Sequence, residues 1–305
     1  MPPEWSDIRI FLFVAATGTY AKAARRLRVS VATIGRRIDA LETSLGLRLF
    51  ERLPSGHRLT EAGQALVPAA GRMAAAAEDF LRDASVADAR QIPVVRLWGQ
   101  EWEASFLASH LPDLTAEIGG AAALEIIMAH ITPSLARREA DVLLAAALPA
   151  GGEMISRRLG RMGFAVYGTS DYIAAHPAAL TEARYQDCDW VGFNADHAYF
   201  DTAKWLDERR GGLPPQQRCS SANVVLDAVR AGVGLAPLPC WVGDKDPRLV
   251  RASTVLPELA RDIWWLVHPD RQAWPPMQRV LDGLVALFRD QSAALAGRLN
   301  SADLS

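Results

Sequence analysis

The stretch TYAKAARRLRVSVATIGRRI, residues 19–38, constrains the fold more than any other part of the chain. It holds six basic side chains and no acidic one, yet apolar residues recur along it at helical spacing. Such a segment buries one face and leaves a concentrated positive charge on the other. Two explanations are open: a plain three-helix bundle with solvated arginines, or a surface that binds a polyanion.

The distribution of charge favours the second explanation. Residues 1–60 contain ten basic and five acidic side chains, whereas the remaining 245 residues contain 23 basic and 30 acidic ones. The formal net charge of −2 therefore hides a basic N-terminal segment and an acidic body. This asymmetry predicts that the N-terminal segment alone meets something anionic.

Capping residues divide this segment into three predicted helices. Ser6 is the expected N-cap of the first helix, which ends at Gly18, and Thr19 caps the second. Ser30 caps the third, which ends at Gly46. The inward face of the third helix consists of Ile34, Ile38 and Leu41. Two helices joined by a short turn in a basic segment are typical of the helix-turn-helix motif.

A helix-turn-helix motif places its second helix in the major groove, so the N-terminal part of the third helix is predicted to face base edges. The dipeptide Pro54-Ser55 with Gly56 predicts a turn between two short strands, which form a small wing. Because all charge, cap and turn features agree, DNA contact is the favoured interpretation. The predicted DNA-contacting residues are Thr19, Tyr20, Ser30, Val31, Ala32, Thr33, Arg36, Arg37, Arg52 and Arg58.

The pieces AARRLRVS, RRIDALE, LGLRLFER and LTEAG, in this order and spacing, resemble the winged helix-turn-helix of LysR-type transcriptional regulators. The resemblance covers about sixty residues. It implies a regulator that binds double-stranded DNA as a homo-oligomer, either dimer or tetramer. The chain departs from the family pattern at Val31, where glutamine is usual, and at Gly35, where serine is usual.

Residues 60–90 are predicted to form one long helix, capped by Thr60 and bent at Pro68. Leu66, Met73, Phe80 and Leu81 form an apolar stripe along it. Such a stripe needs a partner, which is either the chain's own core or a second copy of the helix. The resemblance favours a dimerisation helix, and residues 85–93 are expected to act as a hinge.

From residue 91 onward, apolar strands alternate with helices, which predicts βαβ units and a parallel sheet covered on both faces. The fold class is therefore α+β multidomain: a DNA-binding domain at 1–59, a linker helix at 60–90 and an effector domain at 91–305. The first lobe of that domain is assigned to 91–162 and 269–305, and the second to 163–268. LARREADVLLA and NVVLDAVRAGVGLAPLP resemble the periplasmic-binding-protein-like effector domain of LysR-type regulators.

Ligands of two-lobed α/β domains bind at the carboxyl ends of strands and at helix N-termini. Backbone N–H groups there suit a carboxylate, so a small anionic effector is expected. Trp98 and Trp102 lie nearby and could stack on a ligand ring, although ordinary core or hinge packing is the favoured explanation for both. The predicted effector-binding residues are Gln100, Glu101, Trp102, Thr132, Ser134, Asn194, Ser220 and Ser221.

The sequence contains no phosphate-binding loop, zinc-protease motif or nucleophile elbow, and its six histidines show no metal-ligand spacing. No catalytic residue, metal or cofactor is therefore predicted. Three scattered cysteines and no evident signal or membrane segment favour the cytoplasm. The favoured function is a ligand-responsive transcription factor. An α/β enzyme with an accessory DNA-binding domain and an architectural DNA-binding protein without a ligand remain alternatives.

Overall fold

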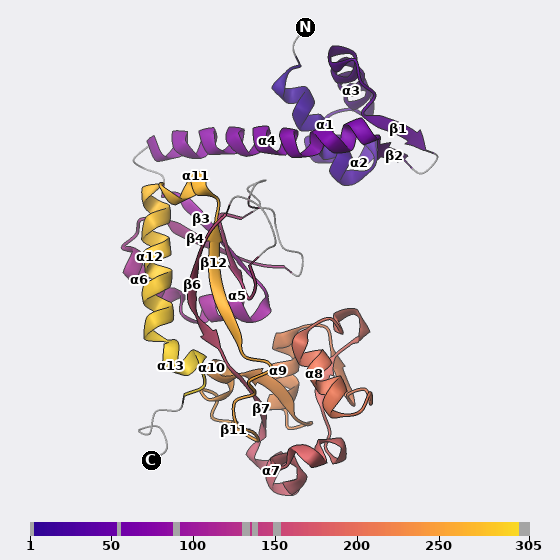
Figure 1. Ribbon diagram of the computed structural model, residues 1–305. Helices are drawn as coiled ribbons and strands as arrows, with labels where there is room; N and C mark the ends of the chain where they lie inside the picture. Colours follow the sequence, from indigo (N-terminus) through magenta and orange to yellow (C-terminus); the bar gives the residue numbers. More distant parts are fainter. Residues whose placement is uncertain are drawn as a thin grey trace. The chain divides into compact units, whose positions relative to one another are not determined.

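The computed structural model describes residues 3–53, 56–87, 92–129, 135, 140–148 and 154–298 (Figure 1). The described chain forms two compact units, which meet in sequence between residues 91 and 92. Each unit is considered by itself below.

The N-terminal unit begins with three helices and a two-stranded wing. The elements are α1 (Trp5–Thr17), α2 (Tyr20–Leu27), α3 (Val31–Leu45), β1 (Phe50–Leu53) and β2 (Gly56–Leu59). Their shared core contains Phe11, Val14, Ala23, Ile34 and Ile38, all buried. The small side chains of α2 are among these buried residues, which allows α2 to approach its neighbours closely.

Two of the three predicted caps are confirmed. The Thr19 hydroxyl accepts a hydrogen bond from the Lys22 N–H at 3.2 Å, and the Ser30 hydroxyl accepts one from the Thr33 N–H at 3.1 Å. The prediction for Ser6 was wrong, because α1 already begins at Trp5 and the N-cap position belongs to Glu4. Ser6 instead lies in the first turn, where its hydroxyl contacts Arg37.

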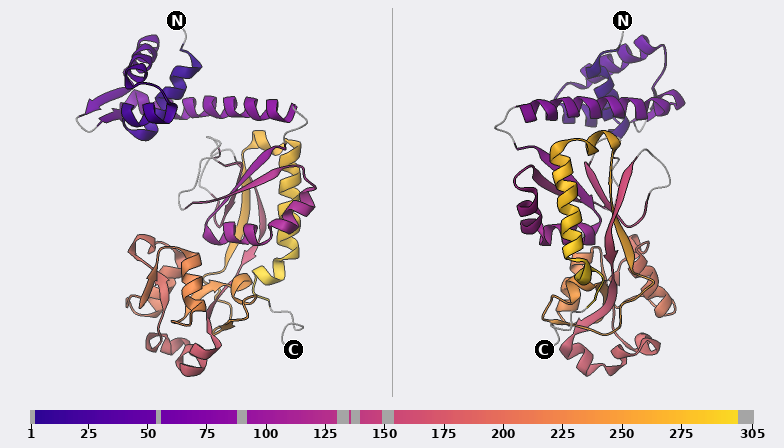
Figure 2. Two further views of the ribbon diagram at one scale, coloured as in Figure 1. Left: turned by 180° about the vertical axis from the view of Figure 1, so that it is seen from behind. Right: turned by 60° about the vertical axis from the view of Figure 1, so that its left-hand side comes forward.

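The long helix α4 (Glu61–Ala87) follows the wing and is capped by Thr60, whose hydroxyl accepts from the Gly63 N–H at 3.0 Å. It continues through Pro68, and Figures 1 and 2 show a straight helix in place of the predicted bend. Pro68 is exposed, so water can satisfy the carbonyl group that proline leaves without a partner. Residues 85–87 of the predicted hinge are helical, and residues 88–91 lie outside the described residues.

The first lobe of the second unit is built on a five-stranded sheet in the order β4-β3-β5-β12-β6. Strands β3, β4 and β5 run parallel, but β12 is antiparallel to both β5 and β6. The predicted all-parallel sheet is therefore a mixed one. The strands are β3 (Val94–Gly99), β4 (Ala123–Met128), β5 (Val142–Ala145), β6 (Ile155–Met162) and β12 (Arg261–Val267).

Strand β12 also corrects the predicted lobe boundary at residue 268. It follows the second lobe in sequence, yet it pairs with β5 and β6 and so belongs to the first lobe from residue 261. Backbone hydrogen bonds between strands distant in sequence decide this assignment, and the local sequence does not reveal them.

One face of this sheet is covered by α5 (Glu101–Ser109), α6 (Leu111–Ile118) and α12 (Pro275–Asp290), and α12 runs along the sheet in Figure 2. The predicted inward residues of α12, from Met277 to Phe288, are buried. The short helices α11 (Pro269–Gln272) and α13 (Ser292–Leu295) flank it. On the opposite face, Trp98, Leu143 and Leu266 form a separate small core. The helix predicted around residues 133–139 lies outside the described residues except for Leu135.

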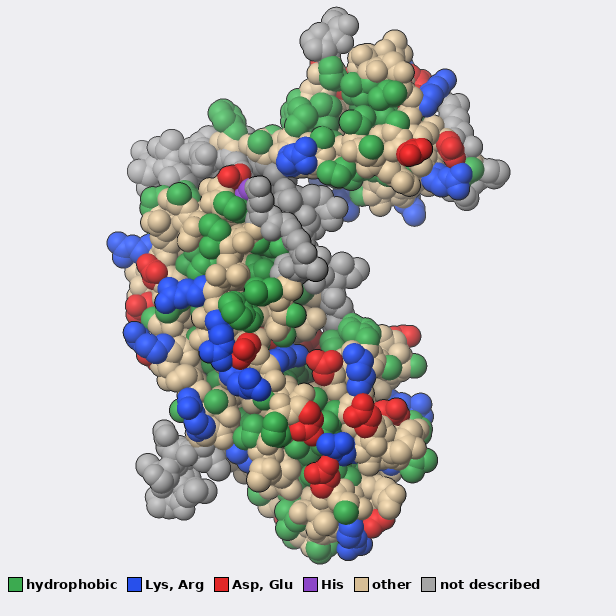
Figure 3. Space-filling view, in the orientation of Figure 1, with side chains coloured by type: hydrophobic (Ala, Val, Ile, Leu, Met, Phe, Trp, Pro, Cys, Tyr) green, Lys and Arg blue, Asp and Glu red, His purple; other side chains and the backbone are tan. Residues whose placement is uncertain are grey.

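The edge strand β6, which sequence analysis missed, carries the exposed Arg157, Arg158 and Arg161. Figure 3 shows Lys and Arg side chains gathered on this part of the body among acidic ones. Arg158 pairs with Asp262 at 2.8 Å. Charged side chains on an edge strand discourage pairing with a further strand, which explains the polar sequence of β6.

The second lobe is mainly antiparallel around β7, which pairs with β10 on one side and β11 on the other. Its helices include α7 and α9 at the positions predicted from sequence. The elements are β7 (Phe164–Thr169), α7 (Ser170–Ala175), η1 (Pro177–Leu180), η2 (Glu182–Asp187), β8 (Val191–Phe193), η3 (Ala195–His197), α8 (Asp201–Arg209), β9 (Gln217–Cys219), α9 (Ala222–Arg230), β10 (Ala236–Pro239), α10 (Cys240–Gly243) and β11 (Leu249–Arg251).

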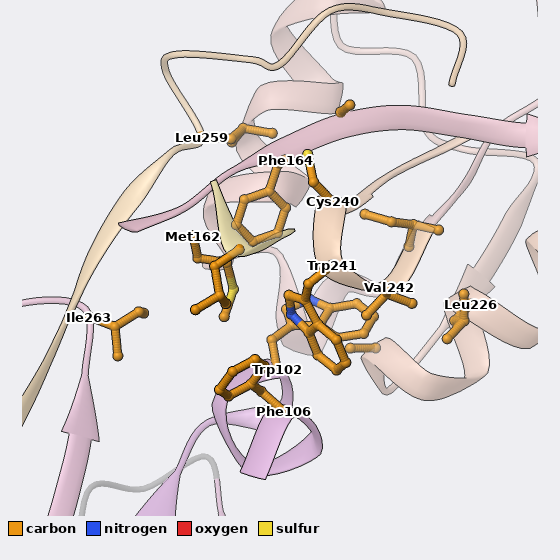
Figure 4. Close-up of a cluster of buried hydrophobic side chains, with 14 of the residues drawn as sticks. Trp102, Phe106, Met162, Phe164, Leu226, Cys240, Trp241, Val242, Leu259 and Ile263 are labelled. Atoms are coloured by element: carbon orange, nitrogen blue, oxygen red, sulfur yellow. The ribbon is translucent and has the colours of Figure 1, made fainter. Parts of the chain in front are cut away.

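The two lobes share one continuous apolar core, part of which Figure 4 shows. Phe106 of α5 meets Trp241 of α10 edge to face, with ring centroids 5.3 Å apart. The chain passes between the lobes twice, at Gly163 and in the segment before β12. Two connections and a common core position α5 against α9 and α10, and this junction contains the cavities described below.

Candidate DNA-binding and effector sites

The start of α3 presents an exposed surface that includes the guanidinium group of Arg36. Val31 is 50% exposed although it is apolar, and Ala32 and Arg36 are exposed beside it. Thr33 is partly buried, and its hydroxyl lies 2.8 Å from that of Ser30. Within the part of the chain that the structure describes, Arg36 forms no ion pair, so its guanidinium remains available to an external anion.

Arg37, the next residue, is used differently. Its Nη1 atom donates to Asp7 at 2.8 Å, to Ser6 at 2.9 Å and to Glu4 at 3.1 Å. The hydrogen bonds to Asp7 and Glu4 raise the pKa of Arg37, and Asp7 itself is only 7% exposed. This side chain joins α3 to the start of α1 and fixes the orientation of α3, and its contact with DNA stays a prediction.

The wing packs against the start of α2 through an aromatic stack. The Tyr20 ring lies parallel to the His57 ring with centroids 3.6 Å apart, and the backbone N–H of His57 donates to the Gly18 carbonyl at 2.8 Å. Tyr20 is thus partly occupied in holding β2, although it was predicted only as a DNA contact. Arg58 pairs with Glu51 across the wing at 2.7 Å. The side chain of Arg52 lies outside the described residues.

Sequence reasoning missed the basic side chains of α2 and of its C-cap residue as candidates. Lys22, Arg25 and Arg28 are exposed, and none of them has a carboxylate partner among the residues described. The helical period would have revealed them, because Ala23 and Ala24 point inward and the basic residues occupy the remaining positions.

In the second unit, Glu101 connects the two lobes. It is the first residue of α5, is 5% exposed, and its Oε2 atom accepts a hydrogen bond from the Ala222 N–H at the start of α9. The Ser221 hydroxyl caps the same helix by accepting from the Val224 N–H at 3.4 Å. A carboxylate thus already occupies the helix N-terminus at which an anionic effector was predicted.

A small cavity of about 30 Å³ adjoins this contact. It is lined by Gln100, Glu101, Trp102, Phe164, Phe193, Phe200, Asp201, Thr202, Ala222 and Arg261. This volume admits two or three water molecules and no organic effector, because a water needs on the order of 10–15 Å³. In the arrangement that the structure describes, this cavity therefore has no room for an organic ligand.

Arg261 is the basic group of this cavity and was not identified from sequence. It pairs with the buried Glu103 at 2.9 Å and lies over the Phe164 ring at 5.3 Å. Its Nε–H is buried and has no acceptor among the described residues. A cationic donor without an acceptor is an attractive point for a ligand oxygen.

The structure brings together only some of the predicted effector residues. Gln100, Glu101 and Trp102 line the cavity between the lobes, whereas Ser220 is exposed and Ser221 is used as a cap. Asn194 lines a separate cavity of about 320 Å³ in the second lobe. Thr132 and Ser134 lie outside the described residues. Trp98, the aromatic candidate, is buried in the small core of the first lobe.

The described residues give little support for a cysteine nucleophile or a metal site. Burial raises the pKa of the Cys188, Cys219 and Cys240 thiols, which makes each of them a poorer nucleophile. The described ranges contain no cluster of three or more potential metal ligands. Among the same residues, no helix is long and apolar enough to cross a bilayer.

A winged helix-turn-helix joined by a long helix to a two-lobed α/β domain defines a class of protein: regulators that bind DNA and respond to a small molecule. Comparison with known proteins makes this specific. The family model described as "Bacterial regulatory helix-turn-helix protein, lysR family" matches residues 5–64. The family model described as "LysR substrate binding domain" matches residues 104–289. The chain belongs to the LysR family of DNA-binding transcriptional regulators, and it is a regulator rather than an enzyme.

Individual relatives agree with this assignment. The chain is 29% identical over 304 residues to the Mau operon transcriptional activator of Paracoccus denitrificans, covering 95% of this chain and 98% of that one. It is 43% identical over 79 residues to an HTH-type transcriptional regulator of Azotobacter vinelandii, covering 26% of this chain and 55% of that relative. The solved structure of full-length CbnR with its target DNA has the same fold, with a TM-score of 0.61, 18% identity, and coverage of 93% and 99%.

Proposed function

We propose that this regulator binds an inverted-repeat operator through the start of α3, with Val31, Ala32, Thr33 and Arg36 toward the bases and phosphates. The observation that carries the proposal is the contrast between the two neighbouring arginines. Arg37 is held by three groups of α1, whereas Arg36 is exposed without an ion pair among the described residues. A fixed helix with a free cation is what major-groove recognition requires.

Further contacts extend this surface. The N-terminus of α2 at Thr19 and Tyr20, and that of α3 at Ser30, supply backbone donors for phosphate oxygens. Lys22 and Arg25 of α2 and its C-cap residue Arg28 add cations, and Arg58 adds one from the wing. A DNA-binding regulator acts where the DNA is, so we place the protein in the cytoplasm.

The operator is read by a homo-oligomer, a dimer or tetramer, assembled through α4. Met73 and Phe80 on α4 are 47% and 73% exposed within one chain. They continue the apolar stripe of the sequence, and an exposed stripe on a long helix is stabilised when a second copy covers it. Two copies present two α3 helices, which corresponds to two half-sites.

The effector binds between the lobes and carries an anionic group that takes the place of Glu101. The N–H of Ala222 and the Nε–H of Arg261 then serve as its donors. Two carboxylates cannot share this site at low cost, so binding displaces Glu101 and separates α5 from α9. A ligand that changes this contact shifts the population of lobe arrangements.

Genome-wide capture of DNA fragments by the purified full-length protein, followed by footprinting, tests the DNA proposal. We expect protected inverted repeats and loss of protection with Arg36→Ala. Capture without any common motif would contradict sequence-specific binding and would favour an architectural role.

A thermal-shift screen of carboxylates and their neutral amides tests the effector proposal. In Glu101→Gln the competing charge is absent while the side-chain shape is kept, so carboxylates should raise Tm more than in the wild-type protein. Equal rises in Tm with acids and with amides would contradict an anionic effector. If carboxylates raise the Tm of Arg261→Met as much as that of the wild-type protein, the effector does not bind beside Arg261.

A further inference from the structure

A second cavity lies at the junction of the lobes, outside the contact between Glu101 and Ala222. Its volume is about 610 Å³, within the range of roughly 300–1,000 Å³ that small-molecule pockets occupy. It is bounded by α5, α9, α10 and the residues that follow α10. None of its lining residues belongs to the cavity at Arg261.

The lining carries a surplus of positive charge. Arg230, Lys245 and Arg248 face a single lining carboxylate, that of Asp246. Asp246 accepts from Arg230 at 2.6 Å and from Arg248 at 3.2 Å, so one buried carboxylate serves two guanidinium groups. The only further acid bonded to this set among the described residues is Asp227, which is largely exposed and therefore screened.

Lys245 has no carboxylate partner among the described residues. Its Nζ atom lies 3.4 Å from His110 Nε2 and 3.3 Å from the amide oxygen of Gln291. The other ring nitrogen of His110 lies 2.9 Å from the Phe106 carbonyl, which can only accept. Nδ1 therefore donates to this carbonyl, and Nε2 is the ring atom that faces the ammonium group of Lys245.

The same cavity has an apolar wall formed by Leu226, Trp241 and Val242. Trp241 is 5% exposed, and its indole N–H has no acceptor among the described residues. A cavity with an apolar wall, a surplus of oriented cationic donors and a spare N–H group is complementary to an organic acid rather than to an inorganic ion alone.

We propose that this cavity is a second ligand site, distinct from the effector site, which binds a small organic anion. A carboxylate or phosphate group contacts Lys245 together with Arg230 or Arg248, and the apolar part of the ligand packs on Leu226 and Val242. Because the lining residues come from both lobes, occupation of this site favours the closed arrangement in which Glu101 contacts Ala222. The ligand therefore opposes the opening that the effector requires.

Isothermal titration of the full-length protein with phenylacetate and with phenyl phosphate tests the proposal, with phenylacetamide as the neutral counterpart. We expect both anions to bind and the amide not to bind, and the stronger anion distinguishes carboxylate from phosphate chemistry. Lys245→Met keeps the length of the side chain and removes its charge, so the Kd should rise about tenfold, the equivalent of one charge-assisted hydrogen bond. Lys204→Met on α8 is the matched control and should leave the Kd unchanged.

Several results would overturn the proposal. These are an absence of heat with either anion up to about 10 mM, equal binding of the amide, or an unchanged Kd in a Lys245→Met protein of normal Tm. A Kd that responds to Glu101→Gln but not to Lys245→Met would place the probe between the lobes instead. If no probe binds and Lys245→Met weakens self-association in sedimentation, the cavity belongs to an interface between copies. Failure of these tests leaves DNA binding and the effector site unaffected.

Discussion

Replacing Arg36 by alanine tests DNA recognition by α3 without a change in the folding of that helix. Arg36 is exposed and has no ion pair among the described residues, so its removal breaks no contact of the folded chain that the structure shows. Folding should therefore be unchanged. Because the guanidinium is proposed to contact a DNA phosphate, operator affinity and its dependence on salt should both fall.

The size of the effect follows from counterion release. Each phosphate contact contributes a slope of about 0.9 to the logarithmic dependence of affinity on salt concentration, and a dimer presents two copies of Arg36, which gives about 1.8. Between about 50 and 200 mM salt, a fourfold range, the loss of affinity should then be about twelvefold smaller for the variant than for the wild-type protein.

Fluorescence anisotropy with a labelled operator over this salt range measures the slope directly. Arg37→Ala is the informative comparison, because it leaves the buried Asp7 without its cation and should lower Tm by loosening α3 from α1. Arg289→Ala, on the exposed side of α12, controls for overall charge. If Arg36→Ala binds DNA with the wild-type slope and affinity, this residue does not contact DNA and the proposed orientation of α3 is refuted.

Three further predictions follow from individual contacts. Gly63→Ala should destabilise the N-terminal unit by about 1–3 kcal/mol in denaturant unfolding, because a Cβ atom there would lie 2.3 Å from the Leu49 carbonyl oxygen. An unchanged denaturant midpoint of unfolding would contradict the tight packing of α4 against the segment that leads into the wing. Burial opposes ionisation of Asp246, but hydrogen bonds from Arg248 and Arg230 outweigh it and lower the pKa of Asp246 to about 2. Its ionised form thus contributes stability that is complete above the ordinary value of 3.8 and is lost as pH falls toward 2, so Asp246→Asn should flatten the dependence of unfolding free energy on pH between these values. Phe80→Glu on α4 should weaken self-association in sedimentation without lowering the Tm of either unit, and normal assembly of this variant would exclude Phe80 from the interface.

The N-terminal unit was largely readable from sequence because its determinants are local. Thr19 and Ser30 cap helices only a few residues away, and helical spacing alone separates the buried Ile34 and Ile38 from the exposed Arg36. The exception is the start of α1. A cap was predicted at Ser6 from its residue type, but the position of Arg37, thirty-one residues later, determines what the Ser6 hydroxyl contacts.

The body was predicted less completely because its contacts are distant in sequence. Strand β6 was missed since its alternation is interrupted by arginines, and β12 was placed in the wrong lobe since nothing near residue 261 indicates which sheet it joins. The effector candidates were chosen from strand ends and helix starts, a rule that includes Glu101 and Trp102 of the cavity lining but not Arg261.

The sequence by itself determined the basic helix α3, the long helix α4 and most of the strands and helices of the body, because caps, helical period and turn residues act over a few positions. Only the tertiary structure decided which side chains remain free. Arg36 and Arg37 are identical and adjacent, yet one faces solvent and the other is held by α1. Likewise, only the packing of α5 against α9 brings Glu101 to Ala222, since hydrogen bonds and ion pairs form between whichever groups the fold brings within reach.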